Sequence, residues 1–532
     1  MTSRSSVYRT GERLLVERER LLLQETLDSG KSSKEKNRLG QFATPTQLAQ
    51  HILQQGMDLL GEGSLVRFLD PAIGTGSFFS ALLSAAPPER IQIARGFEID
   101  PYYGVPSQSF WANSKLEILL EDFTAAEPPP EEEERFNLLI CNPPYVRHHH
   151  IKNGNKARLQ ARISGVSSSA ISGLAGLYCY FMLLSHHWMQ KGGIAGWLVP
   201  SEFMDVNYGT TVKDYLLDKV TLLQIHRFAP HDVQFGDAVV SSAVVWFRNG
   251  KPPQDLRVPF TYGGTLSEPQ IERAVTVRDL RGERKWTRFP AQRKRRKRSV
   301  HKLADLFAIK RGLATGANSF FIMSESKVTQ LGLPEDVVRP ILPSPRSLES
   351  DEVESRSDGI PLLPERHFLL DCRMREEEVM KAYPTVWAYL EQGRRAVADG
   401  YLCRSRKPWY SQEDRPPAPI LCTYLGRRKG KSGHPFRFIL NNSQATATNV
   451  YLLLYPHPPL ARAAEEDPSL YRAIWDELRR LSPEDLLQEG RVYGGGLHKL
   501  EPRELGNVPI DGIAARIPRL RGFLKAGQLE LL

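Results

Sequence analysis

Seven short apolar runs between residues 40 and 249 constrain the fold more than any other feature of the chain. They are separated by amphipathic segments such as Gln47–Leu60 and Leu177–Met189, a pattern that predicts buried strands alternating with helices. This alternation is typical of a mostly parallel sheet with helices on both faces. Only a short loop separates the last two runs, which suits an antiparallel pair. The predicted strands are 65–70, 91–99, 116–122, 136–141, 194–200, 221–228 and 238–247.

Three successive predicted strands end in residues that can bind a ligand. The first leads into the turn Asp70–Gly76, whose glycines permit a tight bend and a close approach to the backbone. The second ends at Glu98, where a dinucleotide-binding fold places its ribose-binding acid. The third ends at Asp122 and Phe123, a carboxylate and a ring that suit an adenine. No Gly-Lys-Ser/Thr follows the turn, so it is not a Walker phosphate loop.

The fourth strand ends in Asn142-Pro143-Pro144-Tyr145. Two consecutive prolines cannot continue a sheet's hydrogen-bond ladder, so the chain must leave the sheet here. The motif therefore presents a side-chain amide, a proline carbonyl and an aromatic ring at the edge where open α/β sheets bind ligands. Such a set can hold and polarise a planar amino group, for example the N6 of adenine.

These four strand ends, in this order, resemble the class I S-adenosylmethionine-dependent methyltransferases. More narrowly, the chain is similar to the TaqI-type γ-class DNA adenine-N6 methyltransferases, since Gly40–Pro45 (GQFATP) matches their N-terminal cofactor motif. The resemblance covers residues 40–250 and is looser over 300–510, where it depends on 310–322, 339–345 and 494–510. It implies a Rossmann-like doubly wound α/β domain followed by a C-terminal α+β target-recognition domain.

The resemblance also implies the cofactor, S-adenosylmethionine, and the residues that bind it. Thr44 and the glycine-rich turn would hold the methionine moiety and the cofactor backbone, and Glu98 the ribose hydroxyls. Asp122 would accept from the cofactor's adenine amine, with Phe123 against its ring. The residue pattern itself makes Thr44, before Pro45, a suitable N-cap for the following helix. The predicted cofactor-binding residues are Thr44, Asp70, Ala72, Gly74, Gly76, Glu98, Asp122 and Phe123.

The catalytic residues predicted from the motif are Asn142, Pro143 and Tyr145. The Asn142 side-chain oxygen and the Pro143 carbonyl can accept both N6 protons, which localises the nitrogen lone pair for in-line attack on the sulfonium methyl. A duplex base must first be flipped out, and stacking on Tyr145 would offset part of that cost. In the related enzymes a second ring comes from the loop between the last two strands, where this chain has Phe235, with Phe228 as the competing candidate. We expect no covalent intermediate and no metal.

The remaining chain predicts further segments around this domain. Residues 1–39 predict a charged helical extension, 40–250 the catalytic domain, 251–300 a basic linker and extension, and 301–532 an irregular α+β unit. The formal net charge is +10. Basic clusters at Arg404–Tyr410 and Arg427–Lys431 would suit phosphate and base contacts in double-stranded DNA. The basic run 293–298 suits either a solvated linker or phosphate contacts.

Other features exclude several protein classes. Five scattered cysteines without a Cys-x-x-Cys pair argue against a zinc site and a disulfide framework, and fit a reducing cytoplasm. The charged N-terminus is not a signal peptide, and no apolar run approaches the roughly 20 residues of a membrane span. The adjacent histidines 148–150 cannot all face one ion, so they predict a polar loop.

The motif alone leaves the acceptor open, because it also occurs in enzymes that methylate RNA adenines or a protein glutamine. Size and the basic second unit favour duplex DNA. An inactive specificity or scaffold protein is the non-enzyme alternative, against which the intact motifs argue. With 39 residues before Gly40, we expect no nuclease domain but a modification methylase paired with a separate restriction endonuclease, or acting alone. The layout resembles modification methylases of the XhoI type, which would imply a CTCGAG site.

Overall fold

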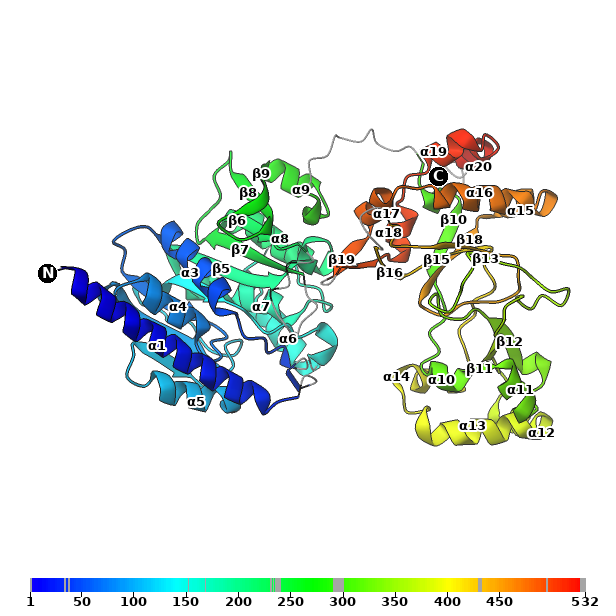
Figure 1. Cartoon of the computed structure of the whole chain (residues 1–532), viewed down its shortest axis with the longest axis horizontal. Coiled ribbons are helices and arrows are strands. Elements are labelled where there is room, and N and C mark those ends of the chain that lie inside the picture. The colour runs from blue at the N-terminus through cyan, green and yellow to red at the C-terminus, as the bar shows by residue number, and fades with distance from the viewer. Residues whose placement is uncertain are drawn as a thin grey trace. The chain divides into compact units, whose positions relative to one another are not determined.

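The computed structural model divides the chain into two compact units (Figure 1). Unit 1 consists of Met1–Arg293 with Tyr493–Gly495, and unit 2 of Lys294–Val492 with Gly496–Leu532. The structure describes residues 2–32, 35–36, 39–151, 153–167, 169–229, 232, 234, 241–289, 301–428, 433–493 and 496–526.

A nine-stranded sheet forms the centre of unit 1, with the strand order β3-β2-β1-β4-β5-β7-β6-β8-β9. Strands β3 to β5 in that order are parallel, and β7 pairs antiparallel with both β5 and β6. The predicted doubly wound, mostly parallel sheet is therefore confirmed, and so is the antiparallel closing pair. The strands are β1 (Val66–Asp70), β2 (Ile91–Phe97), β3 (Leu116–Leu119), β4 (Phe136–Cys141), β5 (Met189–Pro200), β6 (Thr221–Arg227), β7 (Ser242–Arg248), β8 (Arg257–Gly264) and β9 (Pro269–Thr276).

Residues 257–276 extend this sheet, so this part of the predicted linker and extension is an extension of the first domain. Strand β8 pairs parallel with β6, and β9 pairs antiparallel with β8. The following segment buries Trp286 and Phe289 in the same core as Phe260 of β8. The edge strand β9 exposes most of its side chains. Its sequence lacks the apolar run by which β1 to β7 were predicted, and β8 was not predicted either.

The helix predicted over Leu177–Met189 is shorter than expected. It ends at Leu184, residues 185–188 form a 3-10 turn, and Met189 already belongs to β5. Backbone hydrogen bonds between Asn249 and the Gly192-Gly193 pair tie this early part of β5 to the end of β7. The apolar pattern around Met189 was compatible with either a helix or a strand, and strand pairing makes Met189 the start of β5.

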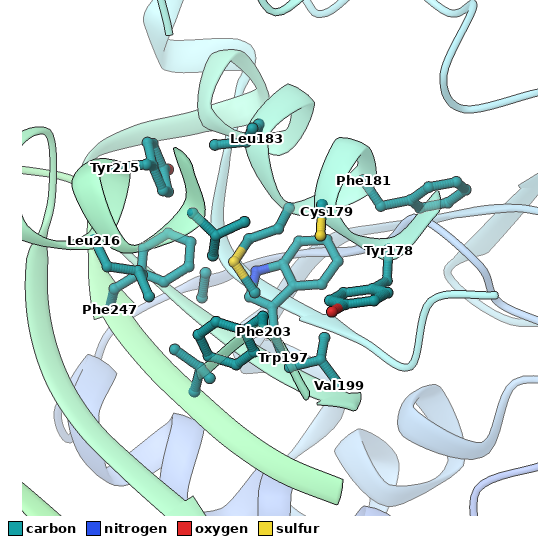
Figure 2. Packing of buried hydrophobic residues seen from close by; sticks show 14 of the residues in the cluster. Tyr178, Cys179, Phe181, Leu183, Trp197, Val199, Phe203, Tyr215, Leu216 and Phe247 are labelled. Carbon is teal, nitrogen blue, oxygen red and sulfur yellow. The ribbon is translucent and has the colours of Figure 1, made fainter. Parts of the chain in front are cut away.

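Helices cover both faces of the sheet (Figure 1). Side chains alternate along β4, so Leu138 and Ile140 pack on one face, with α3, α4 and α5, while Leu139 and Cys141 pack on the other, with α6, α7 and α8. Figure 2 shows this second core, where Trp197 of β5 lies among Tyr178, Cys179 and Phe203. The helices of unit 1 are α1 (Thr2–Ser29), α3 (Thr46–Leu60), α4 (Ser77–Ala85), α5 (Pro101–Trp111), α6 (Asn153–Arg162), α7 (Leu177–Leu184), α8 (Thr210–Asp218) and α9 (Val277–Gly282).

Unit 2 combines short helices with small sheets, as an α+β unit does. A five-stranded sheet has the order β10-β18-β15-β17-β13, and two three-stranded sheets have the orders β11-β14-β12 and β16-β20-β19. Its strands are β10 (Phe307–Arg311), β11 (Ile322–Ser324), β12 (Val338–Ile341), β13 (Glu352–Val353), β14 (His367–Leu370), β15 (Ile420–Thr423), β16 (Leu425–Arg427), β17 (Phe438–Asn441), β18 (Tyr451–Pro456), β19 (Arg491–Tyr493) and β20 (Leu497–Lys499).

The helices of unit 2 are mostly short and amphipathic. They are α10 (Asn318–Phe321), α11 (Glu325–Leu331), α12 (Glu376–Ala382), α13 (Pro384–Ala396), α14 (Tyr401–Arg404), α15 (Pro458–Glu466), α16 (Ser469–Arg479), α17 (Pro483–Glu489), α18 (Pro502–Gly506), α19 (Asp511–Arg516) and α20 (Leu520–Ala526). Within the described ranges of both units, no helix has the length and apolar composition that crossing a membrane requires.

We expect Trp286→Ala to destabilise unit 1 by about 3–5 kcal/mol, the usual cost of emptying a buried aromatic site. Trp286 is 1% exposed, and its indole N–H donates to the Leu280 carbonyl at 3.0 Å. Ile271→Ala in β9, where the side chain is 39% exposed, is the control and should cost less than about 1 kcal/mol. Urea unfolding of the full chain, followed by far-UV circular dichroism, measures both. If both substitutions lowered the free energy of unfolding equally, residues 257–289 would not be part of the hydrophobic core of unit 1.

Candidate active site

The carboxyl ends of β1, β2, β3 and β4 bring the predicted ligand-binding residues to one edge of the sheet. The chain runs outward from β1 to β3 and returns to β4 on the other side of β1, so the strand order reverses there. In open α/β sheets this switch point is where ligands bind. The thiol of Cys141, at the end of β4, hydrogen-bonds to Asp70, at the end of β1. The two strands that flank the switch point therefore meet through side chains.

The turn Asp70–Gly76 leaves one side of its backbone open. Gly74 and Gly76 have φ angles of +54° and +87°, which side chains other than glycine rarely adopt. A Cβ on Gly74 would meet no atom within 4 Å, whereas a Cβ on Gly76 would lie 2.6 Å from Nε1 of Trp111. The open side at Gly74 fits a cofactor that approaches the backbone closely, and the packed side anchors the start of α4.

Glu98 faces the same turn. The backbone N–H groups of Gly74 and Asp100 donate to its carboxylate, the latter over 2.8 Å. Burial raises the pKa of Glu98 to about 7, and it raises the pKa of Asp70, which is 1% exposed, to about 7 as well. The ends of β1 and β2 thus hold two acidic groups beside the glycine-rich backbone, where they can accept from hydroxyl or ammonium groups.

Asp122 uses both carboxylate oxygens inside the protein. Oδ1 accepts from the backbone N–H and the hydroxyl of Thr124 at 2.9 and 2.7 Å, and Oδ2 accepts from Arg158 of α6 at 3.0 Å. Oδ1 already accepts two hydrogen bonds, but Oδ2 can accept a second one, so an exocyclic amine can still bind here. Arg158 follows no motif, and sequence reasoning missed it because its partner lies 36 residues away.

Phe123 belongs to the core beneath this edge. Its side chain is 2% exposed, and its ring lies 5.4 Å from the ring centroids of Phe97, Phe181 and Trp188. These aromatic neighbours already surround the ring of Phe123. The predicted contact between Phe123 and a cofactor adenine stays a prediction.

The side-chain amide of Asn142 has one orientation. Its nitrogen donates to the Phe42 carbonyl at 2.9 Å and to the Thr44 hydroxyl at 3.1 Å. A backbone carbonyl can only accept, so the nitrogen must face Phe42 and the amide oxygen must face the other way. Among the described residues, that oxygen has no hydrogen-bond partner. The motif therefore presents a free acceptor at the carboxyl edge.

The hydroxyl of Thr44 is part of this arrangement and does not cap the following helix. Helix α3 begins at Thr46, so its N-cap position is Pro45, and no side chain caps it. Thr44 is 7% exposed and accepts from Asn142 instead. The N-cap prediction is wrong because the helix starts one residue later than expected. The contact with Asn142 joins the predicted N-terminal cofactor motif to the catalytic motif.

Both the backbone and the side chain of Tyr145 are held by hydrogen bonds. Its backbone N–H donates to the Gly40 carbonyl at 3.3 Å, and its hydroxyl donates to the Leu198 carbonyl at 3.0 Å. Gly40 has a φ of +66°, and a Cβ there would lie 2.4 Å from the Tyr145 nitrogen, so only glycine fits this approach. Burial raises the pKa of the Tyr145 hydroxyl well above its usual value.

Two residues, Phe235 and Phe228, are candidates for the second aromatic ring that would stack on the base. Phe228 is 3% exposed, and its ring packs against His226 with centroids 4.6 Å apart. That placement makes it a core residue. Phe235 lies outside the described residues, as does the basic run 293–298, so both remain predictions.

Part of the basic cluster in unit 2 is structural. Arg406 donates to the carbonyl groups of Ala314 and Thr315, and Trp409 and Tyr410 are buried. In the same cluster Arg404 and Lys407 are exposed. From the second cluster Arg427 is exposed and Arg428 pairs with Glu484 at 2.6 Å, while residues 429–431 lie outside the described ranges. In the part of the chain that the structure describes, no group of three His, Cys, Asp or Glu is placed to hold a metal.

Comparison with known proteins agrees with this geometry. Residues 103–234 match the family described as the Eco57I restriction-modification methylase, and residues 288–530 match the C-terminal domain of the type II methyltransferase M.Eco57I. Type II methyltransferase M.XamI of Xanthomonas campestris pv. amaranthicola is 28% identical over 493 residues, covering 90% of this chain and 86% of the relative. M.AccI of Acinetobacter calcoaceticus is 25% identical over 490 residues, covering 89% and 85%.

A solved structure of the type IIL restriction-modification enzyme MmeI in complex with DNA aligns with a TM-score of 0.48 at 15% identity. That alignment covers 87% of this chain, and the chain spans 63% of the length of that structure.

The strand order of the sheet and the constellation at its carboxyl edge are those of a class I S-adenosylmethionine-dependent methyltransferase. Within that class, the chain is similar to the restriction-modification methylases of the Eco57I group, because it matches the methylase model and then the C-terminal domain model in order along the sequence. S-adenosylmethionine is its cofactor.

The buried acids predict how stability without cofactor depends on pH. Both folded-state pKa values, about 7, lie above the ordinary carboxyl pKa of about 4. The folded state therefore holds protons that the unfolded state has released, and the free energy of unfolding should fall as pH rises from about 4 to about 7. The slope is at most about 1.4 kcal/mol per pH unit for each group.

Asp70→Asn should flatten this slope, because the amide does not ionise. Urea unfolding at pH 5, 6 and 7 measures the effect, and Asp58→Asn, an exposed position in α3, is the matched control. A wild-type slope in Asp70→Asn would contradict the protonated state assigned to Asp70.

Proposed function

We propose that this protein transfers the methyl group of S-adenosylmethionine to N6 of an adenine flipped out of double-stranded DNA. The observation that carries the proposal is the orientation of the Asn142 amide. Phe42 and Thr44 take both of its N–H groups, so the oxygen is available to an amino group and the nitrogen is not. An exocyclic amine that donates two N–H bonds is the partner that this acceptor fits.

The chemistry follows from two acceptors beside each other in sequence. The Asn142 side-chain oxygen and the Pro143 carbonyl would each accept one N6 proton. Holding both N–H bonds draws the lone pair out of the purine ring and directs it toward the methyl donor. The cofactor supplies an electrophilic methyl group. Because the Asn142 amide is already held by two hydrogen bonds, it needs no reorganisation when the base arrives.

A flipped base needs a platform on its faces. The ring of Tyr145 is held by the Leu198 and Gly40 contacts and lies 6.0 Å from the ring of Phe42. Stacking on such a ring offsets part of the unstacking cost, by about 1–3 kcal/mol per base. Phe235 would provide the second face. Burial makes ionisation of the Tyr145 hydroxyl unfavourable, so we assign Tyr145 a stacking role and no acid–base role.

The family supports duplex DNA as the acceptor. Matched relatives are named type II methyltransferases, and the matches cover both the catalytic and the C-terminal parts of the chain. Unit 2 would then be the target-recognition domain, with the exposed Arg404, Lys407 and Arg427 as candidate phosphate or base contacts. In the cell, the modification would protect cytoplasmic DNA from a separate cognate endonuclease. RNA adenine and protein glutamine are the alternative acceptors, and an inactive scaffold is the non-enzyme alternative.

We expect N6-methyladenine at one recurring sequence when the protein is expressed in a methylation-deficient bacterial host. Sequencing of the native host DNA detects the base and identifies the recognition sequence. Purified protein with labelled cofactor should modify unmethylated duplex DNA and leave total RNA and glutamine-containing protein unlabelled. Label only in RNA or in protein would transfer the proposal to that acceptor, and N4-methylcytosine would refute adenine as the target.

Asn142→Ala should lower kcat by about 10²- to 10³-fold, the usual loss on removing one preorganised polar group from a transition state. Affinity for S-adenosylmethionine should change by less than about threefold, because the substitution leaves the predicted cofactor contacts at the ends of β1, β2 and β3 in place. Single-turnover methylation and calorimetric titration measure the two quantities. Asn113→Ala, at an exposed position in unit 1, is the matched control. Normal methylation by Asn142→Ala would refute the mechanism.

A further inference from the structure

Helix α1 carries a polar face that is buried where it crosses the glycine-rich turn. Glu17, Arg20 and Gln24 are spaced three and four residues apart, so they lie on one side of the helix. Arg20 is 1% exposed, and the Glu17 side chain is 15% exposed. Burying a guanidinium and a carboxylate is costly unless both are fully bonded, so their partners show what this face does.

The bonds from this face converge on Thr75, the residue between Gly74 and Gly76. Arg20 Nη1 donates to the Thr75 hydroxyl at 2.9 Å, and that hydroxyl donates to Oε1 of Gln24 at 2.6 Å. On the other side, the indole N–H of Trp111 donates to the Thr75 carbonyl at 3.0 Å. Thr75 is 2% exposed and is therefore held from both sides.

Glu17 completes the arrangement by joining Arg20 to the helices around the turn. Arg20 donates to both carboxylate oxygens of Glu17, each at 2.7 Å. The hydroxyl of Ser80 in α4 also donates to Glu17 at 2.6 Å, and so does that of Thr46 in α3. Burial by itself would raise the pKa of Glu17, but these bonds outweigh it and hold the pKa below its usual value.

The segment after α1 supports the second acid in the same way. Lys31 pairs with Asp100, whose backbone N–H donates to Glu98 at 2.8 Å. The Tyr103 hydroxyl, from α5, donates to Asp28 at 2.7 Å. The chain before residue 32 therefore holds both the glycine-rich turn and the neighbourhood of Glu98.

We propose that Arg20 is a positioning residue for S-adenosylmethionine, acting through Thr75. It holds the glycine-rich turn in its binding conformation from the side opposite to the cofactor, so the turn is ordered before the cofactor arrives. Two glycines with positive φ, one on each side of Thr75, make this turn costly to order, and prior ordering strengthens binding without a direct contact. The proposal depends on the cofactor assignment and does not depend on the acceptor.

The test compares cofactor affinity in full-length variants. Arg20→Met alone would leave Glu17 buried without its cation, so Glu17→Gln/Arg20→Met removes both charges together. We expect its Kd for S-adenosylmethionine to rise about tenfold in calorimetric titration, the scale of one hydrogen bond from a charged group. Arg18→Met, exposed on the same helix, is the matched control and should bind within about twofold of the wild type. Circular dichroism confirms that each variant is folded.

The kinetic constants of the double variant distinguish a positioning role for Arg20 from a merely structural one. A positioning role raises KM for the cofactor and leaves kcat at saturating cofactor and KM for the acceptor unchanged. Thr75→Val should weaken cofactor binding when it is made in the wild-type protein. The same substitution should add little in the Glu17→Gln/Arg20→Met background. Thr75→Ser keeps the hydroxyl, so it should bind the cofactor better than Thr75→Val does.

Unchanged cofactor affinity in the folded double variant, or additive effects of Thr75→Val, would overturn the role of Arg20. A wild-type protein that binds no S-adenosylmethionine would overturn the cofactor assignment and this proposal with it. Normal cofactor binding without methylation of DNA would refute only the proposed acceptor.

Discussion

The reversal of strand order at β1 is the constraint on which the rest of the site depends. It places the ends of β1 and β4 beside each other, so the Cys141 thiol can reach Asp70. The same reversal brings a glycine-rich turn, two buried acids and the Asn142 motif to one edge. Because helices cover both faces of the sheet, a ligand can reach these groups at this edge.

The orientation of the Asn142 amide depends on Phe42 and Thr44, which lie 100 and 98 positions earlier. Phe42 and Thr44 hold the nitrogen of Asn142, and Gly40 receives the backbone of Tyr145. The segment before the sheet therefore contacts the Asn142-Pro143-Pro144-Tyr145 motif directly, and helix α1 contacts the glycine-rich turn through Arg20. Both parts of the site are held by chain segments that precede the first strand.

Much of the fold could be predicted because it depends on local patterns. The run at 136–141 became β4 with the same bounds, since a short apolar run between polar turns has few other uses. The exposed edge strand β9 carries no such pattern and could not be predicted in that way. Helix α3 begins at Thr46 with Pro45 at its N-cap position, so Thr44 does not cap the helix, and its hydroxyl accepts from Asn142 instead.

The sequence by itself determined the order of strands and helices, the glycine-rich turn, the acids at the strand ends and the Asn-Pro-Pro-Tyr motif. These features are local, and each follows from residue type and spacing over a few positions. The tertiary structure decided which way the Asn142 amide points, that Arg158 shares Asp122, that Arg20 is buried against Thr75, and that Trp409 and Tyr410 belong to a core. Those contacts join residues that lie far apart in the sequence. Local residue spacing does not indicate which distant residues come into contact after folding.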